Sequence, residues 1–100
     1  MPVYHIVLFK LKPEAGPEKI QEFEAMAKGM VGKIPGLREM AVAPPLESTA
    51  HRGQGFNLGL VATLEKASDV KIYAEHPVHQ QVHKFREEMA TDTLAYDLVF

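Results

Sequence analysis

The first dozen residues show the alternation that is typical of a β-strand. With a period of two, one face carries Val3, His5, Val7, Phe9 and Leu11, and the other carries Tyr4, Ile6 and Leu8. Because both faces are largely apolar, we expect both to be covered. Helices would cover one face, and another sheet or another subunit would cover the other.

A helical pattern follows the first strand. Pro17 suits the first helical position, where its missing N–H would have no partner in any case. Apolar residues then recur at steps of three and four, namely Ile20, Phe23, Ala27, Met30, Val31 and Ile34. Pro35 and Gly36 end the pattern, which predicts one amphipathic helix over 17–34.

Two more strands and an interrupted helix complete the pattern. The pattern predicts two strands, over residues 37–43 and 56–64, and a polar loop over 44–54 between them. A helix capped by Ser68 breaks at His76-Pro77, because proline disfavours a helical residue before it. A second helical segment runs from Val78 to about Ala90.

The chain ends in an alternating segment, residues 93–100, in which Leu94, Tyr96, Leu98 and Phe100 oppose Ala95, Asp97 and Val99. The resulting order, β-α-β-β-α-β with a broken second helix, predicts an α+β, ferredoxin-like fold. Its four-stranded antiparallel sheet would carry both helices on one face. A single domain over residues 1–100 suits the length of the chain.

The other face of this sheet predicts a homodimer. It would carry Tyr4, Ile6 and Leu8, an exposed apolar patch on a monomer. A chain of this length buries only about 60–70% of the surface that its unfolded form exposes, so a second copy would add useful core. Two sheets meeting face to face would bury the patch.

Charge and cysteine content narrow the possible partners. The formal net charge is -2, from 11 basic and 13 acidic side chains, which argues against nucleic acid and anionic membrane surfaces. The absence of cysteine excludes disulfides and thiolate chemistry. The apolar run at the start is too short for a signal peptide or a membrane span, so we expect a soluble cytoplasmic protein.

Histidines are the main candidates for chemistry. Three of the five, His76, His79 and His83, follow one another at metal-like spacings. No H-E-x-x-H pattern accompanies them, so we interpret them as a solvated helix face and expect no metal. Phosphate loops and dinucleotide fingerprints are also absent, and we expect no cofactor.

His5 and the pair Tyr73 and His79 leave two interpretations open. His5 is either a core histidine hydrogen-bonded to a neighbour or the lining of a cavity between sheet and helices. On an unbroken helix Tyr73 and His79 would lie roughly 120° apart, as a packed and a solvent-facing residue. The break at His76-Pro77 allows them to converge on one pocket.

Taken together, these features resemble the stress-responsive dimeric α/β-barrel family. The most specific ones are the opening Val3-x-His5-Ile-Val-Leu-Phe9 and the segment Tyr73-x-x-His76-Pro77-x-His79. The resemblance covers nearly the whole chain. It implies a homodimer in which two sheets close into a barrel, with a pocket between each sheet and its helices.

Within that family, polyketide cyclases close a linear poly-β-keto thioester by intramolecular aldol condensation without cofactor or metal. Their catalytic tyrosine and histidine match Tyr73 and His79, and two pocket residues match His5 and Phe23. The chain departs from them where a pocket histidine and a pocket tyrosine are replaced by Leu58 and Ala27. The cavity is therefore expected to be less polar.

The resemblance implies a division of roles among these residues. His79 would be the general base, Tyr73 the donor to the enolate, and His5 an orienting group. A polyketide-like or other small hydrophobic ligand would lie against Val7, Phe9, Phe23, Leu58 and Leu60. The alternatives are a stress or defence protein that binds a small apolar ligand without catalysis, and a cofactor-free monooxygenase-like enzyme.

Overall fold

The computed structural model describes residues 1–100 and has the predicted order of elements. The elements are β1 (Val3–Leu11), α1 (Pro17–Lys28), β2 (Leu37–Ala43), the 3-10 helix η1 (Glu47–Gly53), β3 (Leu58–Leu64), α2 (Asp69–Glu75), α3 (Pro77–Met89) and β4 (Ala90–Val99). The ferredoxin-like α+β prediction is confirmed, including the break in the second helix.

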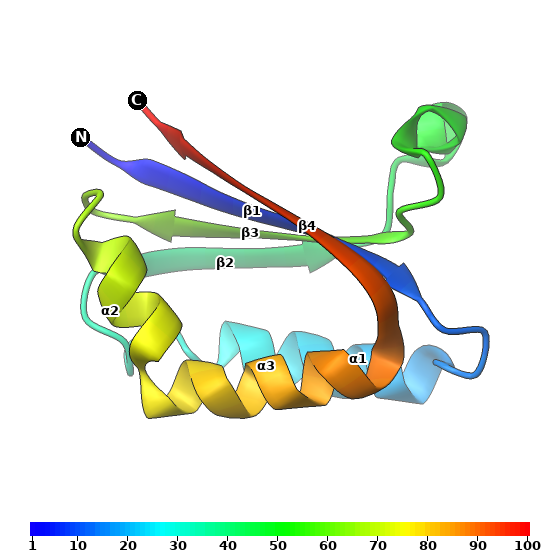
Figure 1. Cartoon of the computed structure of the whole chain (residues 1–100), viewed down its shortest axis with the longest axis horizontal. Helices are drawn as coiled ribbons and strands as arrows, with labels where there is room; N and C mark the ends of the chain where they lie inside the picture. Colours follow the sequence, from blue (N-terminus) through cyan, green and yellow to red (C-terminus); the bar gives the residue numbers. More distant parts are fainter.

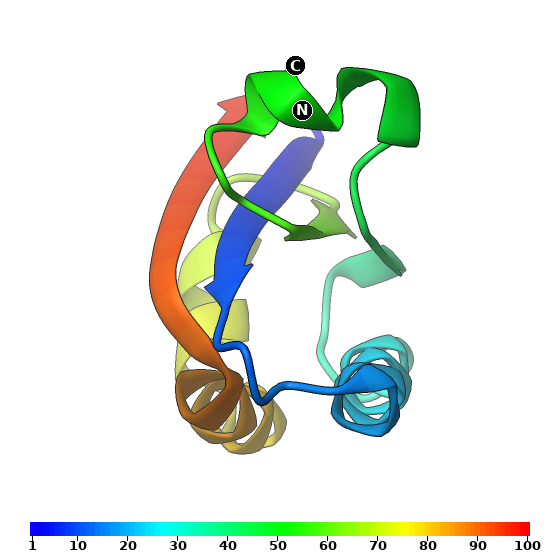
Figure 2. The ribbon, with the colours of Figure 1, turned by 90° about the vertical axis from the view of Figure 1, so that its right-hand side faces the viewer.

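The four strands form one antiparallel sheet in the order β2-β3-β1-β4. The helices α1, α2 and α3 lie on one side of it, while η1 lies at its far end, away from the helical layer (Figure 1). Seen from the end, β1 and β4 run side by side above the helices (Figure 2). The chain therefore forms two layers, and only one face of the sheet is covered.

The core lies between these two layers, where the alternation of β1 predicts it. Val3, Val7 and Phe9 are buried, whereas Tyr4 is exposed on the other face. The ring of Phe9 meets that of Phe23 from α1 edge to face, with centroids 5.5 Å apart. Such pairs add to the burial that the hydrophobic spacing of strand and helix already provides.

The uncovered face is apolar across both terminal strands. The register pairs Tyr4 with Leu98, Ile6 with Tyr96 and Leu8 with Leu94. The partners from β4 are all exposed, and the ring of Phe100 lies 4.5 Å from that of Tyr4. We call this surface of β1 and β4 the outer face.

Three boundaries differ from those that the sequence predicts. Helix α1 ends at Lys28 instead of continuing to residue 34. Gly32 has a φ of +90°, which no right-handed helix allows, and Val31 is exposed although Ile34 returns to the core. Strand β3 begins at Leu58 instead of residue 56, and β4 begins at Ala90, directly after α3. None of the helices has the length and apolar character needed to cross a membrane.

Candidate active site

A cavity of about 280 Å³ lies between the sheet and the helices α2 and α3. Of its 13 lining residues, nine are hydrophobic. The lining consists of His5, Val7, Phe9, Phe23, Leu60, Val70, Tyr73, Ala74, His79, Val82, His83, Arg86 and Ala95. A volume of this size is near the lower end for small-molecule sites, so it suits a small and largely apolar ligand.

All but one of the candidate catalytic and ligand-binding residues predicted from the sequence line this cavity. Leu58 is buried in the core but does not line the cavity. In the register it lies opposite Phe9, whereas Leu60 lies opposite Val7, nearer to His5. Leu58 thus lies one step further along the sheet from His5 than Leu60 does, and its contact with a ligand stays a prediction that the lining of this cavity does not support.

The break between α2 and α3 brings Tyr73 and His79 together. His76 is extended, with a ψ of 135°, and its Nδ1 accepts a hydrogen bond from the N–H of Val78, which caps α3. The change of direction places the rings of Tyr73 and His79 4.4 Å apart. Tyr73 is 2% exposed, and the half-buried His79 lines the cavity.

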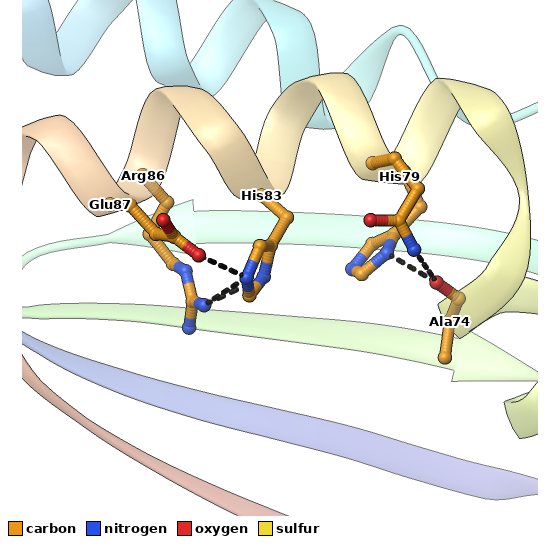
Figure 3. A network of polar contacts seen from close by, with 6 residues as sticks. Ala74, His79, His83, Arg86 and Glu87 are labelled. Carbon is orange, nitrogen blue, oxygen red and sulfur yellow. Dashed lines mark hydrogen bonds and ion pairs between the residues drawn. The ribbon is translucent and has the colours of Figure 1, made fainter.

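The break also determines which tautomer His79 adopts. A helix end leaves carbonyl groups unpaired, and here Ala74 O accepts from His79 Nδ1 at 3.1 Å (Figure 3). Gln80 Nε2 donates to the same oxygen at 2.7 Å. Because a carbonyl oxygen only accepts, Nδ1 carries the proton, and Nε2 of the neutral ring has a free lone pair.

Burial shifts the pKa values of these two residues in opposite directions. Burial lowers the pKa of the His79 imidazole, and the nearby charges of His83, His5 and Arg86 lower it further. The hydrogen bond to Ala74 has the opposite effect and raises this pKa. Burial raises the pKa of Tyr73 to about 12, although Arg86 opposes this shift. At neutral pH the cavity thus holds a neutral imidazole, protonated at Nδ1 alone, beside a phenol that keeps its proton.

His5 lines the cavity and is also hydrogen-bonded within the fold, so both interpretations apply to it. Its ring meets that of Tyr73 edge to face at 5.2 Å, and its Nδ1 donates to Asp97 Oδ1 at 2.5 Å. Asp97 lies directly opposite His5 in the register between β1 and β4. The sequence does not point to Asp97 as a partner of His5. Alternation predicts which face of the last strand Asp97 occupies, but it does not predict how this strand aligns with β1.

Arg86 is the second residue that sequence reasoning missed. With His79, Val82 and His83 it follows an i, i+3, i+4, i+7 spacing along α3, which would have placed it on the same face. Its Nη2 donates to His83 Nδ1 at 2.7 Å, and His83 Nε2 contacts Glu87 Oε1 at 2.6 Å (Figure 3). Desolvation by burial lowers the pKa of Arg86, against the raising effect of Glu87.

The three neighbouring histidines thus have three different environments. His76 caps a helix, His79 contacts Tyr73, and His83 lies between Arg86 and Glu87. No group of three or more His, Cys, Asp or Glu side chains is arranged to hold a metal ion.

Comparison with known proteins gives a family and several structures of the same fold. Residues 3–100 match the family model described as the Stress responsive A/B Barrel Domain. No curated protein matches the sequence. A dimeric protein of ferredoxin-like fold from Bacteroides fragilis is 28% identical, with a TM-score of 0.81 and coverage of 99% of this chain and 96% of that chain.

Two further structures are more distant in sequence and show the fold alone. A dimeric ferredoxin-like protein from Jannaschia is 23% identical, with a TM-score of 0.87 and full coverage of both chains. A hydroxynitrile lyase from Passiflora edulis is 17% identical, with a TM-score of 0.87 and coverage of 99% of this chain and 93% of that chain.

Proposed function

We propose a function from the premise that the chain belongs to the stress responsive A/B barrel domain family. In this proposal the protein is a homodimeric acid–base catalyst that needs no cofactor. Its substrate would be a small, largely apolar molecule with a carbon activated by neighbouring carbonyl groups. The cavity between the sheet and α2 and α3 would hold this substrate. Fold alone does not assign a reaction, so the proposal depends on the side chains of the cavity.

His79 would be the general base. Its Nε2 lone pair is free because Nδ1 donates to Ala74 O, and its lowered pKa keeps the ring neutral at pH 7. Nε2 would take a proton from a CH₂ group between two carbonyls, leaving an enolate. In an intramolecular aldol closure the enolate carbon would attack a second carbonyl carbon of the same molecule, and the resulting alkoxide would regain a proton from His79.

Tyr73 would stabilise the enolate. Its phenol keeps its proton at neutral pH and can donate a hydrogen bond to the developing oxyanion. His5, held by Asp97, would orient Tyr73 or the ligand from the sheet side. The apolar lining, with Val7, Phe9, Phe23 and Leu60, would exclude water and strengthen these polar interactions.

One observation carries this proposal. The neutral imidazole of His79 and the protonated phenol of Tyr73 lie in an apolar cavity with their ring centroids 4.4 Å apart. Pairs of titratable groups whose environments push their pKa values apart are typical of acid–base sites. The resemblance to polyketide cyclases supports an aldol-type ring closure of a poly-β-keto substrate. The homodimer is supported by the apolar outer face and by structures of this fold that are described as dimeric.

Turnover of a linear poly-β-keto thioester tests the catalytic assignment. We expect His79→Gln to lower the rate of ring closure by roughly 10²–10⁴-fold, the usual contribution of a general base. Tyr73→Phe, which removes only a hydroxyl, should also lower it. The matched control is His51→Gln, an exposed histidine on η1 that should leave the rate unchanged.

The second candidate is a protein that binds a small apolar ligand without catalysis, favoured by the nine hydrophobic residues in the lining. It predicts that the wild-type protein does not close the ring faster than the uncatalysed reaction. Turnover that is unchanged in folded His79→Gln and Tyr73→Phe variants would refute the assignment of these two residues as base and donor.

A further inference from the structure

Arg86 is a cation without a carboxylate in contact. None of the ion pairs in the molecule includes it. Its Nε atom is shielded from solvent and has no hydrogen-bond partner, the only such buried side-chain atom in the chain. An unsatisfied buried donor is costly, and more so on a charged group, so this atom is expected to have a partner in the functional state.

The position of Arg86 indicates where that partner would be. Its side chain lines the apolar cavity, with Cζ 5.7 Å from the centroid of the Phe9 ring. It also lines a polar hollow formed by the end of α3 and the start of β4, which includes Thr91 and Asp92. Arg86 therefore lies at the boundary between the apolar cavity and a polar opening.

Two neighbours hold the guanidinium in place without neutralising it by direct contact. Because arginine only donates, His83 Nδ1 accepts from Nη2 and the opposite ring nitrogen, Nε2, donates to Glu87 (Figure 3). The Glu87 carboxylate contacts His83, and its side chain is 63% exposed. The imidazole thus fixes one edge of the guanidinium and leaves Nε free.

We propose that Arg86 makes this cavity a site for apolar carboxylates. The carboxylate would bind the guanidinium, and the hydrocarbon part would lie against Phe9, Phe23 and Val82. This inference deepens the proposed function and rests on it, since it adds a carboxylate to the carbonyl-activated substrate class of the same cavity. The thioester of the turnover assay, which has no carboxylate, probes the catalytic residues alone. Arg86 would decide specificity, while Tyr73 and His79 would perform the chemistry.

Charge favours a carboxylate over a phosphate. A phosphate monoester carries about -1.5 to -2 charges at pH 7, and the single guanidinium beside a largely apolar lining would leave part of that charge unpaired. A carboxylate carries one charge, and its two oxygens match the planar guanidinium. The charge of Arg86 also reaches Tyr73 and His79, whose pKa values it lowers.

Calorimetric titration with octanoate and octanamide tests this inference, because the two ligands share a hydrocarbon chain and differ in charge. We expect octanoate to bind the wild-type protein roughly 10- to 100-fold more tightly, the range expected for a charge-assisted hydrogen bond. Arg86→Met should abolish the difference while keeping the affinity for octanamide. The control Arg52→Met removes the same charge from η1, outside the cavity, and should preserve the difference.

The outcomes separate this inference from the proposed function. Equal binding of the two ligands by the wild-type protein would overturn the carboxylate assignment and leave acid–base catalysis standing. Octanoate selectivity that depends on Arg86, in a protein whose turnover is insensitive to His79→Gln, would support the carboxylate site and refute the role of His79 as general base. Binding of neither ligand would overturn the inference. If Arg86→Met does not fold, Arg86→Lys, which loses the paired donors, should reduce the selectivity, and unchanged selectivity would count against the proposal.

Discussion

At the scale of single residues, one physical cause acts on both members of the candidate catalytic pair. Desolvation disfavours the charged form of each group, so it lowers the pKa of His79 and raises that of Tyr73. At the same neutral pH, the imidazole of His79 is therefore uncharged and can accept a proton, while the phenol of Tyr73 keeps its proton and can donate a hydrogen bond. The apolar lining of the cavity, which binds the ligand in our proposal, also sets these protonation states.

The raised pKa of Tyr73 predicts a loss of stability in alkaline solution. Between pH 10 and pH 12 the unfolded chain releases the phenol proton while the folded chain keeps it, so stability falls as pH rises. Tyr73→Phe should remove about 2 kcal/mol of this fall at pH 12. Urea unfolding from pH 9 to pH 12 measures it.

The control for this experiment is Tyr96→Phe, which lies on the outer face of β4 and does not line the cavity. It should retain the wild-type pH dependence because Tyr73 is intact. If Tyr73→Phe and the wild-type protein lose the same free energy over this range, the buried phenol does not have the raised pKa on which its role as a donor depends.

At the scale of elements, two junctions position the site. The first is the extended His76 between α2 and α3, which frees the carbonyl of Ala74 for His79. The second is the turn at Gly36 before β2, which packs against the start of α2. There the buried Asp69 accepts a hydrogen bond from the N–H of Lys66 at 3.2 Å. Since Tyr73 follows four residues later on the same helix, this turn helps to fix α2 over the sheet.

We therefore expect Gly36→Ala to be strongly destabilising. Gly36 has a φ of +85°, and an added Cβ would lie 2.4 Å from Cγ of Asp69. The backbone strain and the overpacking together predict a loss of about 2–5 kcal/mol. Gly32→Ala is the matched control, with a φ of +90° but open space around the Cβ, and should lose only about 1–2 kcal/mol.

Chemical denaturation of the two glycine variants gives this comparison directly. The difference between them isolates the contact with Asp69, because the backbone strain is common to both. Equal losses would show that Asp69 moves aside at little cost and that the turn does not hold α2.

At the scale of the whole molecule, the uncovered face of the sheet is the main unexplained surface. Leu94, Tyr96 and Leu98 are exposed on β4 beside Tyr4 of β1. A monomer rarely leaves so apolar a face open, and stable interfaces typically bury on the order of 1,600 Å² in total. In the proposed homodimer this face is covered, and the cavity on the opposite side of the sheet remains accessible.

Ile6→Asp tests the proposed interface. We expect the wild-type protein to be a dimer at micromolar concentration, and the variant to dissociate or unfold because a charge would be buried without a partner. Light scattering measures the mass. The control is Ile72→Asp, at an exposed position on α2, which should stay dimeric. A monomeric wild-type protein would contradict the proposal.

The sequence by itself determined the element order, the inward face of β1 and the break in the second helix. These features depend on local spacing and on proline, which act over a few residues. The early end of α1 was less readable, because Met30 and Ile34 return to the core from turns and so continue the apolar spacing beyond Lys28.

The site required the tertiary structure. The pairing of His5 with Asp97 depends on a register between strands at opposite ends of the chain, and the approach of His79 to Tyr73 depends on the angle taken at His76. Neither quantity is encoded in the spacing of nearby residues, because each is set by how whole elements pack. The missing partner of Arg86 is likewise visible only when every neighbour in space is known.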